Sequence, residues 1–115
     1  MEHAIFPEVS KDLVDKRREL APEIYGAFRT FNQRVFADGA LSSKTKDLIA
    51  VAVAHVTQCP YCIRGHTASA LKKGATEQEV MEAIWVAAEM RAGGAYAHSL
   101  LALDEMAKAR EASGA

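Results

Sequence analysis

The amino-acid sequence predicts an all-α fold of about six helices in a single domain that spans residues 1–115. Apolar residues recur every three or four positions, which is the spacing of an amphipathic helix. Alanine, the strongest helix former, is abundant in the second half of the chain, and none of the three prolines lies after Pro60. A chain of this length has room for one hydrophobic core but not for a second sizeable one.

The first third of the chain is expected to hold an irregular arm at residues 1–9 and then two helices. Ser10 is a good N-cap, and apolar residues keep helical spacing from there to Ala21. Pro22 opens the second helix or marks a kink, because proline fits the first turn of a helix but not its interior. Asp38–Gly39 is typical of a turn. The apolar stripe of the second helix consists of Ile24, Phe28, Phe31 and Val35.

A third helix is expected over residues 44–57, after a cap in the segment Leu41–Ser43. Its sequence AVAVAHV also alternates like a strand, but the alanine content and a length near fourteen residues favour a buried helix. Pro60 suits the first position of a fourth helix. Lys72 and Lys73 complement the dipole at its C-terminal end, and Gly74 is a favourable residue just beyond that end.

The last part of the chain begins with the capping box Thr76–Glu79. Gly93–Gly94 is expected to interrupt or kink the helix that follows, so that residues 95–112 form a separate last helix. The core-facing stripe before the glycines consists of Val80, Ala83, Ile84 and Ala87. The apolar residues after them are Ala97, Leu100, Leu101 and Met106.

Charge and hydropathy argue against two classes of partner. The formal net charge is −1, and lysine and arginine do not cluster, so there is no electrostatic reason to expect nucleic acid. The longest apolar run, Leu48–Ala54, is far shorter than the about 20 residues of a membrane-spanning helix. Pro7 and Glu8 stand where a secretory signal has its basic and apolar regions. We therefore expect a soluble, cytoplasmic protein.

The segment from His55 to His66 carries the candidate chemistry. If Pro60 opens a helix, Cys59 is its N-cap and Cys62 lies at N3, where unpaired backbone N–H groups and the helix dipole favour a thiolate. His66 follows Cys62 by four residues and therefore shares its face, where it can accept the thiol proton. Asp47, on the preceding helix, is a candidate to orient His66.

Each of these residues also has a purely structural interpretation. The cysteines could be buried and inert, and Asp47 is favourable near a helix start whatever its function. His55 lies four residues before Cys59 and could support the site or merely end an apolar helix. Tyr61 could donate a hydroxyl hydrogen bond or pack. The sequence leaves both of these possible supporting residues open.

Two other motifs compete for the same residues. The tetrapeptide CPYC is that of glutaredoxins, but residues 61–112 contain neither a strand-like window nor the proline that a thioredoxin-type fold needs. His55, Cys59, Cys62 and His66 are suitable zinc ligands by type. They lie mostly along one helical stripe, however, and cannot readily surround an ion, so no metal is expected.

The pattern CxxCxxxH, with an acid twelve residues before the first cysteine, resembles the alkyl hydroperoxidase D-like branch of the carboxymuconolactone decarboxylase superfamily. The resemblance covers about residues 41–106, the expected family core. It implies an all-helical bundle subunit of a homo-oligomer, either a trimer or a hexamer, that works without a cofactor. It also implies reduction of a hydroperoxide substrate by a dithiol reductant, either a lipoyl protein or a thioredoxin-like protein.

By that resemblance Cys62 is the peroxidatic cysteine and Cys59 resolves its sulfenic acid into a disulfide. His66 relays the proton that activates Cys62, assisted by Asp47. Two positions depart from the family pattern. Asp47 stands where glutamate is frequent, so the relay could need a bridging water, and Tyr61 replaces a histidine of the characterised peroxidases.

Two alternative functions remain open at this point. A carboxymuconolactone decarboxylase-type lyase would need no cysteine pair, so the motif CPYC argues against it. A non-catalytic redox sensor would use the pair for thiol exchange without turnover. In either case a helical subunit this small has limited means of burying all its apolar stripes, which predicts a homo-oligomer.

Overall fold

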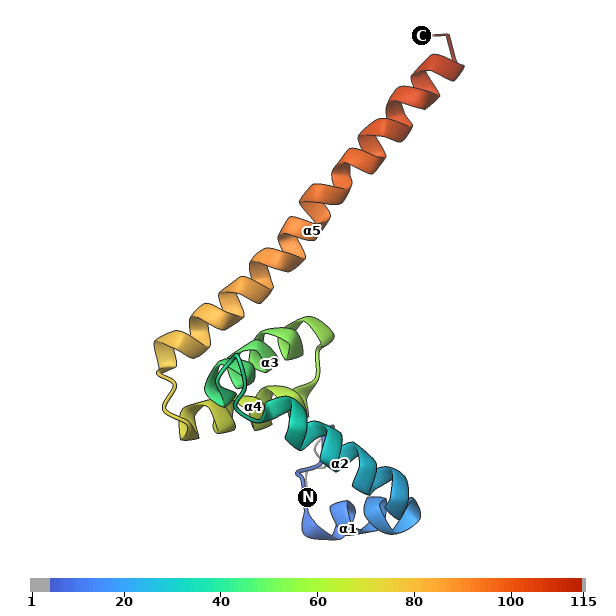
Figure 1. Cartoon of the computed structure of the whole chain (residues 1–115). Coiled ribbons are helices and arrows are strands. Elements are labelled where there is room, and N and C mark those ends of the chain that lie inside the picture. The colour runs from blue at the N-terminus through green and yellow to red at the C-terminus, as the bar shows by residue number, and fades with distance from the viewer. Residues whose placement is uncertain (1–4, 115) are drawn as a thin grey trace.

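The computed structural model describes residues 5–114, and within this range every regular element is a helix. The all-α class is therefore confirmed, and the strand alternative for residues 50–56 is excluded (Figure 1). The elements are α1 (Lys11–Leu20), α2 (Pro22–Phe36), α3 (Ser43–Thr57), α4 (Pro60–Lys72) and α5 (Glu77–Ala112).

Helices α1 and α2 form a hairpin at the N-terminal end. The Ser10 side chain accepts a hydrogen bond from the backbone N–H of Leu13 and so caps α1. Pro22 occupies the first turn of α2, so it opens a new helix rather than kinking α1. Of the irregular arm expected at residues 1–9, the first four residues lie outside the described part of the chain. Residues 5–10 contain no helix.

Helices α3 and α4 pack antiparallel because only two residues separate them. Gln58 has a left-handed backbone, with φ 59°, and its N–H closes the end of α3 on the carbonyl of Ala54. At the other end of α3, the Ser42 hydroxyl accepts from the backbone N–H of Thr45 at 3.1 Å. The two caps fix the length of α3 and so set its register against α4.

The expectation of a break at Gly93–Gly94 is wrong: α5 is one uninterrupted helix, so the described part of the chain holds five helices rather than about six. Neither glycine has a positive φ. Each costs about 1 kcal/mol relative to alanine, but the alanine, leucine, methionine and glutamate residues around them favour helix, and the hydrogen-bond ladder continues. The capping box at Thr76 is present as expected, with reciprocal bonds between Thr76 and Glu79.

The hydrophobic core lies among α3, α4 and residues 77–91 of α5, which we call the packed region. Its only buried charged residue among those described is Asp47. An ion pair between Lys44 and Glu79 and a hydrogen bond from Arg91 to the carbonyl of Val56, at 3.0 Å, tie α5 to α3. The buried apolar residues are Val51, Ala54, Ala70, Ala75, Val80 and Ala87.

The remaining helices leave their apolar stripes uncovered. Residues 93–112 of α5, which we call the distal segment, extend clear of the other elements (Figure 1). The radius of gyration is 20.8 Å, whereas a compact chain of this length has about 13 Å. A bundle is thus formed by the packed region alone. The exposed stripes are Ile24, Phe28, Phe31 and Val35 on α2, and Tyr96, Leu100, Leu101, Leu103 and Met106 on α5.

Across the described residues, no helix combines the length and the apolar character that a membrane crossing requires.

Candidate active site at the start of helix α4

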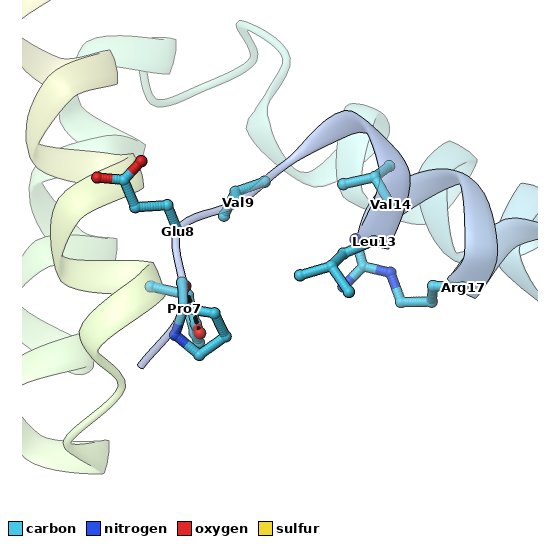
Figure 2. A pocket seen from close by; sticks show the side chains of 7 residues that line it. Pro7, Glu8, Val9, Leu13, Val14 and Arg17 are labelled. Carbon is cyan, nitrogen blue, oxygen red and sulfur yellow. Dashed lines mark hydrogen bonds between the residues drawn. The ribbon is translucent and has the colours of Figure 1, made fainter. Parts of the chain in front are cut away.

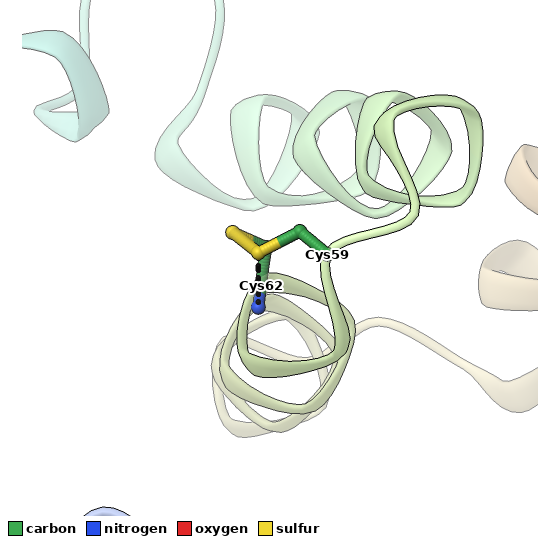
Figure 3. The surroundings of a disulfide bond; sticks show 2 residues. All are labelled: Cys59 and Cys62. Atoms are coloured by element: carbon green, nitrogen blue, oxygen red, sulfur yellow. Dashed lines mark hydrogen bonds between the residues drawn. A yellow bond between two sulfur atoms is a disulfide. The ribbon is translucent and has the colours of Figure 1, made fainter. Parts of the chain in front are cut away.

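Cys59 and Cys62 form a disulfide in the first turn of α4, with their Cα atoms 5.3 Å apart. Cys59 is the N-cap of this helix, as expected, and its Sγ accepts the backbone N–H of Cys62 at 3.2 Å. Figure 3 shows the bond on the flank of α4 nearest α3. When the bond is reduced, the same N–H and the helix dipole stabilise negative charge on the Cys59 sulfur.

The two cysteines differ in their access to solvent. Cys62 is exposed, whereas Cys59 is only partly so. Cys62 is therefore the more exposed residue of the pair. Cys62 also lies one helical turn before His66, so the exposed cysteine is the one that shares a face with the imidazole.

One turn further along α4, the buried carboxylate of Asp47 holds three side chains together. Its Oδ1 contacts Nδ1 of His66 at 2.9 Å. Its Oδ2 accepts the hydroxyl of Ser69 at 2.7 Å and the ammonium of Lys73 at 2.6 Å. Antiparallel packing places Asp47 opposite this part of α4, and its short side chain reaches His66 directly, without a bridging water.

Asp47 is ionised in this environment. Burial raises the pKa of its carboxyl, since only 2% of Asp47 is exposed. The contacts of the carboxylate lower the pKa by more than burial raises it. Hydrogen bonds from Lys73, His66 and Ser69, together with the charge of Lys73, bring the pKa below its ordinary value of 3.8. Because the ionised oxygen can only accept, Nδ1 of His66 carries the hydrogen in this contact.

This contact determines which ring nitrogen of a neutral His66 carries the hydrogen. With the hydrogen on Nδ1, Nε2 of the neutral imidazole is left as the basic nitrogen. The ring also stacks on Phe36 of α2, with centroids 4.7 Å apart and planes at 28°. Hydrogen bonding and stacking together hold the orientation of a histidine whose side chain is 26% exposed. The arrangement can accept a proton from a group beside α4.

The two possible supporting residues, His55 and Tyr61, form hydrogen bonds with backbone carbonyls and not with Asp47 or His66 within the described range. Nδ1 of His55 donates to the carbonyl of Val51 on its own helix, at 2.7 Å. The hydroxyl of Tyr61 donates to the carbonyl of Pro7, also at 2.7 Å, and its ring meets Phe6 edge-on. Asp47 and His66 are therefore brought together, whereas His55 and Tyr61 join neither of them in the hydrogen bonds of the described residues.

Sequence reasoning missed four residues that contact this group. Ser69 and Lys73 follow His66 by three and seven positions and so share its face of α4. Ser43 precedes Asp47 by one turn and accepts a second hydrogen bond from Lys73, at 2.5 Å. The spacing of Ser69 and Lys73 was a usable signal. The stacking of Phe36 depends on the path of residues 37–42 and left no signal in the sequence.

Two surface hollows lie near the site. One, of about 320 Å³, opens beside His66 between α2 and α4. The other, of about 410 Å³, lies between the N-terminal arm, α1 and Tyr61 (Figure 2). The first is lined by Asn32, Gln33, Phe36, Ala37, Asp47, Gly65, His66, Ser69 and Lys73. The second is lined by Pro7, Glu8, Val9, Leu13, Val14, Arg17 and Tyr61.

In the oxidised state the site offers no thiolate for a metal, because both sulfurs of the ligand set considered above are used in the disulfide.

Comparison with known proteins gives a consistent result. Residues 22–105 match the carboxymuconolactone decarboxylase family. The chain is 57% identical over 103 residues to "Uncharacterized protein 4 in cox locus" of Paracoccus denitrificans, covering 87% of this chain and 92% of the relative.

Two solved structures share the fold. The first, a carboxymuconolactone decarboxylase family protein from Legionella pneumophila in its apo form, has a TM-score of 0.66 and 39% identity, over 69% of this chain and 70% of that one. The second, a protein from Methanobacterium thermoautotrophicum, has a TM-score of 0.68 and 38% identity, over 72% of this chain and 93% of that one.

Proposed function

Since the chain belongs to the carboxymuconolactone decarboxylase family, we propose that it is a thiol-dependent peroxidase of the alkyl hydroperoxidase D-like type. The observation that carries the proposal is a CxxC disulfide one helical turn from a histidine that a buried carboxylate orients. An exposed Cys62 lies one turn from His66, whose Nδ1 is held by the ionised Asp47 at 2.9 Å. This arrangement supports removal of a thiol proton by Nε2.

In the oxidative half-reaction, His66 takes the proton of the Cys62 thiol. The thiolate attacks the distal oxygen of a hydroperoxide, so that an S–O bond forms as the O–O bond breaks. The departing alkoxide recovers the proton from the His66 imidazolium and leaves as an alcohol, or as water when the substrate is hydrogen peroxide. Cys62 is left as a sulfenic acid.

The disulfide forms in the next step and is then reduced. The sulfur of Cys59 attacks the sulfenic sulfur of Cys62, the S–O bond breaks, and water leaves with the proton of the Cys59 thiol. A dithiol reductant returns two electrons and two protons. It attacks the sulfur of Cys62, the more exposed residue of the pair, and Cys59 leaves as a thiolate that its N-cap position stabilises.

The test is consumption of cumene hydroperoxide by the wild type, Cys62→Ser and His66→Ala, with dihydrolipoamide and thioredoxin as alternative reductants. We expect turnover with a dithiol, loss of turnover to the background rate in Cys62→Ser, and about 10²-fold or greater loss in His66→Ala. A disulfide that forms without turnover would instead support a sensor. Lactone decarboxylation that persists in the Cys59→Ser, Cys62→Ser double variant would support a lyase.

We further propose that copies of this chain assemble into a homo-oligomer, as a trimer or a hexamer. The accessible surface is 9321 Å², whereas a compact monomer of this size exposes about 6,200 Å². The excess of roughly 3,000 Å² is of the size that obligate interfaces cover. Leu100 and Leu103 in the distal segment and Phe28 and Phe31 on α2 supply apolar stripes for a second copy to cover.

Light scattering with size exclusion at micromolar concentration tests the assembly. We expect the mass of three or six chains for the wild type and a smaller species for Leu100→Glu, because the new charge would be buried in the interface. Ala109→Glu, which introduces the same charge at an exposed position half a turn around the same helix from Leu100, serves as the control and is expected to keep the wild-type mass. A wild-type monomer would overturn the proposal.

A further inference from the structure

We propose that Lys73 is a positioning residue of the site, which holds Asp47 in the orientation and charge state that keep Nε2 of His66 basic. The inference rests on the proposed part of His66 in thiol chemistry and extends it to a residue at the far end of α4. Lys73 is the C-cap of that helix, seven residues beyond His66.

The geometry places Lys73 on the carboxylate rather than in solvent. Its Nζ lies 2.6 Å from Oδ2 of Asp47 and 2.5 Å from the hydroxyl of Ser43. Ser69 donates to the same Oδ2 at 2.7 Å. Ser69 of α4 and the C-cap Lys73 both donate to Oδ2 of Asp47. The other oxygen, Oδ1, is therefore available to accept from Nδ1 of His66. Lys73 and Ser69 thus fix which oxygen His66 meets.

The charge of Lys73 matters because Asp47 is buried. An ionised carboxylate that is 2% exposed is costly unless a cation compensates it, and a neutral imidazole supplies no charge. Without Lys73, burial would favour the protonated acid. A protonated Asp47 can donate to Nδ1, which moves the imidazole hydrogen to Nε2 and leaves that nitrogen unable to accept a proton.

Among residues 5–114, no other charged group lines the hollow beside His66. Helix α2 contributes Asn32, Gln33 and Phe36, all uncharged, and α5 contributes no lining residue. The charged and titratable groups there are Asp47 from α3 and His66 and Lys73 from α4. The charged groups that face the His66 ring are therefore the Asp47–Lys73 pair, so a change at Lys73 can be interpreted without a competing charge in this hollow.

The experiment follows one thiol and one imidazole as pH changes. In a Cys59→Ser background, the rate of Cys62 alkylation by iodoacetamide is measured from pH 4 to 9, and ¹⁵N NMR reports the hydrogen on each His66 ring nitrogen. The wild-type ring should carry its hydrogen on Nδ1. In Lys73→Met, the acid limb of alkylation should move up by about one to two pH units, and the neutral ring should carry its hydrogen on Nε2.

Two further variants separate positioning from mere packing. Lys73→Arg keeps the charge and should restore most of the wild-type profile. Lys72→Met removes a neighbouring exposed charge and should leave the profile unchanged. If Lys73→Met fails to fold, Lys73→Gln makes the same comparison, because it retains a donor without the charge. An unchanged acid limb and an unchanged His66 tautomer in the uncharged variant would overturn the inference.

These readouts require no peroxide turnover, so the two proposals can fail separately. If the wild type reduces no hydroperoxide but Lys73→Met still shifts the pH profile of alkylation, the peroxidase proposal is rejected and the role of Lys73 is supported. If the wild type is an active peroxidase but Lys73→Met leaves the pH profile of alkylation unchanged, only the proposed role of Lys73 is rejected.

Discussion

The packed region and the uncovered helices have similar apolar patterns in the sequence, but their apolar side chains are buried in the first and exposed in the second. Val51 and Val80 in the packed region are 0% and 7% exposed, whereas Phe28 on α2 and Leu100 in the distal segment are 63% and 69% exposed. All the buried residues among those described lie between positions 47 and 87. An amphipathic stripe therefore predicts a face that will be covered, but not which partner covers it.

The candidate site lies in the packed region, whose helices contact one another within a single chain. Asp47, His66 and Lys73 all come from α3 and α4, and the disulfide lies at the start of α4. The exposed stripes serve a different purpose in our proposal, which is assembly. The following predictions compare matched substitutions in the two regions.

The largest difference is expected between the two aspartates Asp47 and Asp104. Asp47→Ala should lower the free energy of unfolding by about 3 kcal/mol, because it leaves Lys73 and His66 without their buried partner. This is near the low end for a broken buried pair, since Lys73 is partly exposed and can turn to water. Asp104→Ala breaks an exposed pair with Lys108 and should cost less than about 0.5 kcal/mol. Urea unfolding at fixed protein concentration measures both.

The next difference is expected between two apolar truncations. Val51→Ala should cost about 2 kcal/mol, since Val51 is fully buried and the lost methyl groups leave a cavity. Leu103→Ala, in the distal segment, should act only through association, so its effect on the melting temperature should vanish as the protein is diluted. A concentration-independent loss in Leu103→Ala would show that the distal segment packs within its own chain.

A smaller difference is expected between two helix caps. Thr76→Ala removes one half of the capping box of α5 and should cost about 1 kcal/mol. Ser10→Ala removes the cap of α1, whose bond to Leu13 is longer, at 3.3 Å, and whose helix has no buried residue. We expect a loss below about 0.5 kcal/mol there. Equal losses in thermal unfolding would contradict the division into two regions.

The smallest expected effect is a dependence on acid. The pKa of Asp47 is lower in the folded chain than its ordinary value of 3.8, so its stabilising contribution is present above that value and is lost as pH falls through the folded pKa. Asp47→Asn should therefore lose less stability than the wild type between pH 5 and 2. Asp104→Asn should follow the wild-type slope.

Glu79 sets a baseline for that measurement. The backbone N–H of Thr76 and the side chain of Lys44 lower its pKa, so it contributes in the same direction. Because Glu79 is present in both Asp47→Asn and Asp104→Asn, its contribution cancels in the comparison. An equal slope in the two variants would mean that Asp47 is not the buried acid that couples folding to pH.

Local signals in the sequence predicted most of the fold correctly. Pro22 and Pro60 open helices, and Ser10 and Thr76 cap them, because each acts through its own backbone or its nearest neighbours. The failure at Gly93–Gly94 has the same origin. A local rule treats two glycines as a break, whereas their cost is spread over a helix of 36 residues rich in good helix formers.

The candidate site was predictable along α4 and only partly across to α3. The spacing from Cys62 to His66 follows from helical geometry alone. Contact between Asp47 and His66 depends on the register of two helices, which the left-handed Gln58 sets. The role of Lys73 depends on burial of Asp47, and burial is a property of the packed chain that spacing does not reveal.

The separation of Cys59 and Cys62 by one helical turn has a mechanical consequence. Their Cα atoms, 5.3 Å apart, already stand within the range that a disulfide spans. Breaking or forming the disulfide therefore requires only rotation of the two side chains, without movement of the backbone of α4. In the proposed peroxidase cycle, the cysteine pair would therefore be oxidised and reduced repeatedly without disturbing the residues that hold the proposed oligomer together.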